Sequence, residues 1–95
     1  MRSGSRTGLQ QAFAWSDRCK PVRISFSGRA TAGSLIRVGG VFRVLNGRCA
    51  GQRVNGFTVV YKAPSGYQGI AKVSYMLKAA NNRDYYSFTR LMNIR

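Results

Sequence analysis

The chain has 95 residues, a length that fits one domain, and 44% of them are apolar, which argues against intrinsic disorder. It has no run of roughly 18 apolar residues, so the sequence predicts no transmembrane helix. Sixteen Lys and Arg face only Asp17 and Asp84, for a net charge of +14, and because self-repulsion costs stability we expect an anionic partner. The alternative is that the charge serves solubility or reflects a bias in composition.

The first element in chain order is a weakly patterned N-terminal segment. Residues after Met1 as far as Gly8 are mostly Gly, Ser, Thr and Arg, and Leu9–Trp15 has the length of a short helix. We expect residues 1–14 to be a disordered remnant or a short helical segment. The folded domain is then expected to span residues 15–95.

From residue 20 onward the hydrophobic period is two. Val22, Ile24 and Phe26 alternate with polar residues, which predicts a strand with one buried face. Residues 35–38 and 41–45 flank Gly39-Gly40, a pair that predicts a two-residue hairpin because both glycines tolerate positive φ.

Further turns and strands follow in the second half of the chain. Asn46-Gly47 and Asn55-Gly56 predict tight turns by the same chemistry, and Asn81–Asp84 predicts the last turn. The intervening apolar segments predict three strands, over Phe57–Lys62, Ile70–Lys78 and Tyr85–Ile94. In Ile70–Lys78 the expected inner residues are Ala71, Val73, Tyr75 and Leu77, and in the last strand they are Tyr86, Phe88, Met92 and Ile94.

These elements predict an all-β fold. About six or seven short strands, with turn signals every ten residues or so, are typical of an antiparallel β-sandwich or a small barrel. A small OB-like barrel is the alternative to the sandwich.

One stretch resembles a known family. The segment VVYKAPSGYQGIAKVSY, residues 59–75, resembles the motif of bacterial immunoglobulin-like and cadherin-like modules, including small exported forms with paired cysteines found in alphaproteobacteria. The matching positions are Tyr61, Pro64, Gly66, Tyr67, Gly69, Val73 and Tyr75. The resemblance implies an immunoglobulin-like β-sandwich in the periplasm or outside the cell. Ala71 stands where the family commonly has Asp, so the resemblance does not imply a calcium site.

Cys19 and Cys49 are a candidate disulfide. In a small domain with a thin core a single pair is typical of one crosslink, provided that the compartment is oxidising. Closing a loop of about 30 residues would contribute roughly 3.5 kcal/mol on the chain-entropy model. The alternative is two unpaired buried thiols in a cytoplasmic protein.

The sequence lacks the residues on which most enzyme active sites depend. The chain has no histidine, which removes the commonest general base and the Ser-His-Asp triad. It has no glutamate, so Asp17 and Asp84 are the only side-chain carboxylates for acid/base work or for a metal ion. We therefore expect a non-enzymatic protein without a metal or a cofactor.

The sequence thus predicts an exported binding or structural module with an Arg-rich surface. The partner would be an anionic polymer, a lipid head group or an acidic protein surface. The alternative is a basic β domain that binds nucleic acid without sequence preference. The expected contacts, on the outward face of the strands, are Arg23, Arg37, Arg43, Lys72, Lys78 and Arg90.

Overall fold

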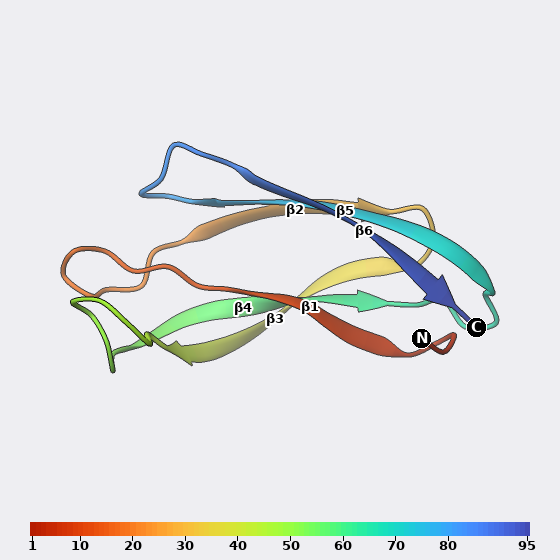
Figure 1. Ribbon diagram of the computed structural model, residues 1–95, viewed down its shortest axis with the longest axis horizontal. Helices are drawn as coiled ribbons and strands as arrows, with labels where there is room; N and C mark the ends of the chain where they lie inside the picture. The colour runs from red at the N-terminus through yellow and green to blue at the C-terminus, as the bar shows by residue number, and fades with distance from the viewer.

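A computed structural model describes all 95 residues, which form six antiparallel strands and no helix (Figure 1). Nothing in the fold therefore has the form of a membrane-spanning helix. The all-β prediction is confirmed. The strands are β1 (Arg6–Ala12), β2 (Ile24–Ala30), β3 (Ser34–Arg43), β4 (Arg53–Lys62), β5 (Gly69–Ala79) and β6 (Tyr86–Ile94).

The strands make two three-stranded sheets that lie face to face as a small sandwich (Figure 1). One sheet has the order β1-β4-β3 and is the lower layer in Figure 1, and the other has the order β2-β5-β6. The sequence places the most regular apolar alternation on β4 and β5, which are the central strands. The outer strands of each sheet leave two open edges between the layers, one between β2 and β3 and one between β1 and β6.

The main core lies between the two central strands. Val59 and Tyr61 of β4 and Val73 and Tyr75 of β5 are at most 2% exposed. The Tyr61 hydroxyl donates to the Ala32 carbonyl at 2.8 Å. Burial raises the pKa of Tyr61 above its ordinary value of 10.0, and the neighbouring Tyr67 hydroxyl adds to the rise. The predicted inner face of β5 is confirmed, because Ala71, Val73, Tyr75 and Leu77 are all buried.

The N-terminal segment joins the fold, so the prediction of disorder or a short helix over residues 1–14 is wrong. Arg6–Ala12 forms β1, which pairs antiparallel with β4. The pairing register shifts between Gly8 and Gln10, and this bulge interrupts the alternation that would have marked a strand in the sequence. The Met1 ammonium donates to the Asn93 carbonyl at 2.8 Å, so the two chain ends lie side by side.

Two of the predicted turns lie instead within continuous strands. Gly39-Gly40 lies inside β3 and Asn55-Gly56 inside β4, with Gly40 directly opposite Gly56. A Cβ at Gly56 would lie 2.7 Å from the Phe13 Cβ, and one at Gly40 would lie 3.4 Å from the Phe42 ring. Gly40 makes room for the Phe42 ring and Gly56 for the close approach of Ala12 and Phe13, which is why glycine occurs at these strand positions.

The remaining turn predictions are confirmed. Gly47, with a φ of 79°, lies in the loop between β3 and β4. The segments Pro64–Gln68 and Ala80–Tyr85 connect β4 to β5 and β5 to β6. Tyr86 shares a face with Leu77, as predicted, yet it is 53% exposed because it lies at an open edge of the sandwich.

Candidate functional site

The two cysteines join two loops at the end of the sandwich opposite the chain termini. The sulfur atoms of Cys19 and Cys49 lie at disulfide distance, with Cα atoms 5.4 Å apart, as the sequence predicted. One loop follows β1 and the other joins β3 to β4 (Figure 1). Arg18 and Lys20 flank Cys19 in the chain, and Arg48 precedes Cys49. The crosslink therefore brings three cations from distant parts of the sequence together.

Two further arginines stand at the base of these loops. Arg43 ends β3 and Arg53 begins β4, and the two are direct cross-strand partners. Like charges in that position are destabilising unless an anion lies between them. We call the five exposed cations Arg18, Lys20, Arg43, Arg48 and Arg53 the basic lobe. Asp17 is the only acidic residue in these loops.

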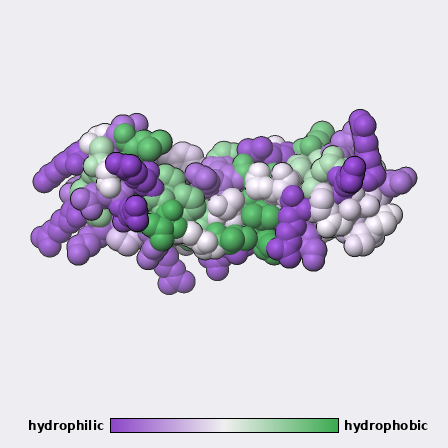
Figure 2. Space-filling model, turned by 90° about the horizontal axis from the view of Figure 1, so that it is seen from below, coloured by the Kyte–Doolittle hydropathy of each residue, from purple (hydrophilic) through white to green (hydrophobic).

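The outer face of the β1-β4-β3 sheet is mixed in hydropathy. Figure 2 shows hydrophilic side chains gathered most densely at the end of the crosslinked loops, and apolar and hydrophilic side chains side by side over the middle. Ile36, Val38 and Val60 project from this middle region by their register, and Val38 is 46% exposed. This face is therefore not uniformly basic, because apolar side chains project from its middle.

A small second core supports the basic lobe. Val44, Cys49 and Val54 are at most 3% exposed and pack together on the outer side of the β1-β4-β3 sheet. Beside them the Phe13 ring stacks on the Phe42 ring, with centroids 4.9 Å apart and an interplanar angle of 6°. This packing and the crosslink hold the lobe against the end of the sheet.

The structure scatters the six cations predicted as contacts. Lys72 and Lys78 lie on the outer face of the β2-β5-β6 sheet, and the Lys78 Nζ is 5.8 Å from the centre of the Tyr85 ring. The prediction of a common outward face is wrong for the other three cations on strands, Arg37, Arg43 and Arg90. Directly opposed residues of neighbouring strands project from the same face of a sheet. Their partners place them on the inner side: Arg37 opposite Val59, Arg43 opposite Arg53, and Arg90 opposite Val73.

Arg37 and Arg23 meet at the open edge between β2 and β3. Together with Asn55 and Phe57 they line a cleft of about 220 Å³, which we call the charged cleft. The Arg37 guanidinium carbon lies 5.5 Å from the centre of the Phe57 ring. Stacking on a nearly buried ring restricts the guanidinium and leaves its N–H edge available.

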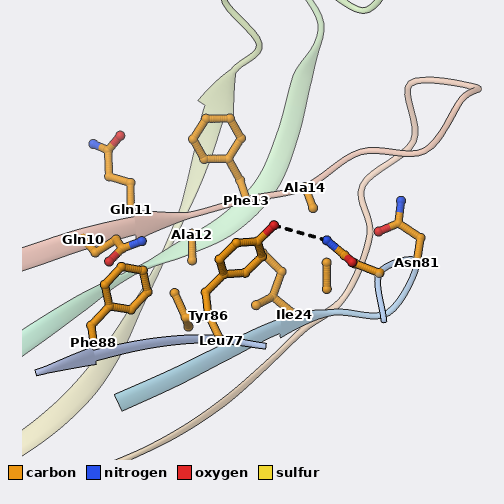
Figure 3. A pocket seen from close by; sticks show the side chains of 12 residues that line it. Gln10, Gln11, Ala12, Phe13, Ala14, Ile24, Leu77, Asn81, Tyr86 and Phe88 are labelled. Carbon is orange, nitrogen blue, oxygen red and sulfur yellow. Dashed lines mark hydrogen bonds between the residues drawn. The ribbon is translucent and has the colours of Figure 1, made fainter. Parts of the chain in front are cut away.

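The opposite edge, between β1 and β6, holds a larger cleft of about 380 Å³ (Figure 3). None of its lining residues is charged, and we call it the neutral cleft. Gln10 points toward Phe88 in Figure 3, whereas Gln11 and Phe13 lie on the other side of β1 from Tyr86. The side chains that face the cleft are therefore amides, aromatic rings and aliphatic groups.

Hydrogen bonds hold the amides of the neutral cleft. The Tyr75 hydroxyl donates to Gln10 Oε1 at 2.9 Å, and Asn82 Nδ2 donates to the Tyr86 hydroxyl at 3.5 Å, the dashed line in Figure 3. Ala12 and Ile24 line both clefts, so the neutral and charged clefts lie on two sides of one thin wall.

Sequence reasoning missed four cations of the basic lobe: Arg18, Lys20, Arg48 and Arg53. A signal for three of them was present, because they directly flank the cysteines, and a crosslink brings its flanking residues together. The role of Arg53 depends on the β3–β4 register, which the predicted hairpin at Gly39-Gly40 had placed elsewhere.

Comparison of the chain with protein-family models, with curated proteins and with solved structures finds no match.

Proposed function

We propose that this protein is a non-enzymatic binding module that holds an anionic partner through its basic lobe. The observation that carries the proposal is the convergence of five exposed cations on one crosslinked end, with Asp17 the only acidic residue in the two crosslinked loops. The cross-strand pair Arg43 and Arg53 supports it, because their mutual repulsion is relieved when an anion binds between them.

The cysteine pair supports an oxidising compartment, the periplasm or the cell exterior, as the place of action. Disulfides persist there and are rare in the cytosol. The partners that fit are an anionic envelope polymer, a lipid head group array or an acidic protein surface. Arginine suits all three, because its planar fork pairs with carboxylates and phosphates.

Single-stranded nucleic acid is the second candidate partner, and one observation favours it. Tyr85 is 63% exposed, and the Lys78 Nζ lies 5.8 Å from the centre of its ring, whereas Tyr86, 53% exposed, lies on the other face of the strand. An exposed aromatic ring beside a cation can stack on a base.

A salt titration tests the proposal. Binding of a fluorescent polyanion, such as polyglutamate or polyphosphate, is measured over a series of salt concentrations, with single-stranded DNA in parallel. We expect affinity to fall steeply with salt, and Arg43→Gln/Arg53→Gln to reduce the log–log slope by about 2, one for each lost anion contact.

The matched control is Arg29→Gln/Lys72→Gln, which removes the same charge from the outer face of the other sheet. It should change the slope by less than the lobe variant does. Equal effects of the two variants, or a flat salt response of the wild type, would refute binding at the lobe. Tighter binding of DNA, lost on Tyr85→Ala/Tyr86→Ala, would support the second candidate instead.

A further inference from the structure

We infer that the charged cleft between β2 and β3 is a specific receptor for a single pendant oxyanion, a carboxylate or phosphate group, of that anionic partner. The inference rests on the proposed function and names the group that the partner must present. The side chains that would hold the oxyanion are Arg37, Arg23 and Asn55, which line the same cleft.

The donors of this cleft have no partner within the protein. None of the side-chain hydrogen bonds of the molecule engages a guanidinium. Each guanidinium carries five N–H donors, and the Asn55 amide adds two more. A carboxylate or phosphate accepts such donors two at a time in the fork geometry of arginine.

Arg37 is held in place before a ligand arrives. Its guanidinium lies over the Phe57 ring, and Phe57 is only 9% exposed and contacts Phe26 edge-on, with centroids 5.9 Å apart. A side chain restricted in this way loses less freedom on binding than a freely moving surface arginine. This restriction separates Arg37 from cations such as Lys72, for which no such contact is seen.

Charge and size set the class of ligand. No acidic residue lines the charged cleft, so its two cations have no counter-charge there. Its volume of about 220 Å³ is below the range of about 300–1,000 Å³ that encloses a whole drug-sized ligand. The cleft therefore fits a terminal or side group, while the rest of a polymer lies outside along the strand edge toward Arg43.

The test follows the arginine Nε–Hε signals by NMR while inorganic phosphate or acetate is added at constant ionic strength. We expect saturable shifts of Arg37 and Arg23, with the other arginines moving little. Arg37→Lys keeps the charge but loses the fork and the ring stacking, and should weaken probe binding about tenfold. Lys72→Gln is the matched control and should weaken it less than about twofold.

Each outcome decides the inference. Saturable shifts confined to the cleft, together with the loss in Arg37→Lys, support it, and the tighter of the two probes identifies phosphate or carboxylate as the group. Non-saturating shifts spread over all arginines, or equal effects of Arg37→Lys and Lys72→Gln, overturn it. In that case, if polyanion binding still depended steeply on salt, the proposal of binding at the basic lobe would remain supported. If polyanion binding showed no salt dependence, both proposals would be refuted.

Discussion

The two clefts of the sandwich differ in charge although they share a wall. The charged cleft presents Arg23 and Arg37, and the neutral cleft presents amides and aromatic rings without a single charge. Ala12 and Ile24 belong to both. In a chain with sixteen cations, a charge-free cleft shows that arginine is not spread evenly over every opening.

The difference between them arises at the outer strands of each sheet. β3 places Arg37 on its inner side at one edge, and β6 places Tyr86 and Phe88 on its inner side at the other. The central strands β4 and β5 carry ordinary apolar core residues beside both clefts. A three-stranded sheet leaves its inner face open at the edges, so inward-facing residues that would be buried in a wider sheet line the two clefts here.

The largest expected effect comes from the crosslink, which holds the segment that ends in Arg23. Cys19→Ser/Cys49→Ser should lower the free energy of unfolding by roughly 3.5 kcal/mol, measured by urea denaturation. Phosphate binding at the charged cleft should weaken, whereas the Gln10 and Tyr86 signals of the neutral cleft should stay near their wild-type positions. An unchanged urea midpoint would show that the lobe packing alone holds the loops.

Gly56→Ala tests the wall itself. The added Cβ would lie 2.7 Å from the Phe13 Cβ and would meet the Ala12 carbonyl, which borders both clefts. We expect a loss of about 1–3 kcal/mol in unfolding free energy and changed signals in both clefts. Gly39→Ala is the control, since no heavy atom lies within 4 Å of its Cβ, and it should change stability by less than about 0.5 kcal/mol.

Tyr75→Phe should affect only the neutral cleft. It removes the hydroxyl that donates to Gln10 Oε1 at 2.9 Å, at a cost of about 1 kcal/mol in thermal or urea unfolding. Phosphate affinity should be unchanged, because Tyr75 does not line the charged cleft. Tyr67→Phe removes an exposed hydroxyl that donates to the Ile70 carbonyl at 3.3 Å and should cost less. A loss of phosphate affinity in Tyr75→Phe would mean that the clefts are coupled.

Phe57→Leu should affect the charged cleft. Without the ring beneath the Arg37 guanidinium, phosphate affinity should fall about two- to fivefold, as expected for a cation–π contact of about 0.5–1 kcal/mol. Phe88→Leu, the corresponding change in the neutral cleft, should leave it unchanged. The NMR titration described above measures both variants.

The ionisation of Tyr61 affects stability only in alkali, so both clefts can be compared at neutral pH. Because burial raises the pKa of the folded-state hydroxyl, the contribution of neutral Tyr61 is fully present below its ordinary pKa of 10.0 and is lost as pH rises through the folded value. Unfolding free energy should therefore fall in alkali, measured by urea denaturation across that range. Tyr61→Phe should flatten this fall.

Sequence patterning predicted the central strands better than the outer ones. Val73, Tyr75 and Leu77 alternate cleanly because β5 is paired on both sides and packs one face on the core. The N-terminal strand was not predicted, because its bulge breaks the alternation of inward-facing and outward-facing residues. Gly40 and Gly56 resembled turn residues, but Gly40 makes room for the Phe42 ring, and the role of Gly56 depends on Ala12 and Phe13, which come from a distant part of the chain.

The candidate site was less predictable than the fold. The disulfide pair was anticipated, but the side of the sheet on which Arg37 or Arg90 lies depends on register, and register is set by contacts between strands far apart in the sequence. Neither cleft has a sequence motif, because each is lined from both sheets and from loops.

The adjacent chain ends give the molecule a direction. Arg95 donates its backbone N–H to the Met1 carbonyl at 2.8 Å, at the far end of the 47 Å long axis from the crosslinked loops (Figure 1). A tether attached at either end of the chain would thus leave Arg48 and its neighbours at the opposite, free end of the molecule. A fusion at either end should leave that tip unobstructed, whereas an insertion between Gly47 and Arg48 would block it.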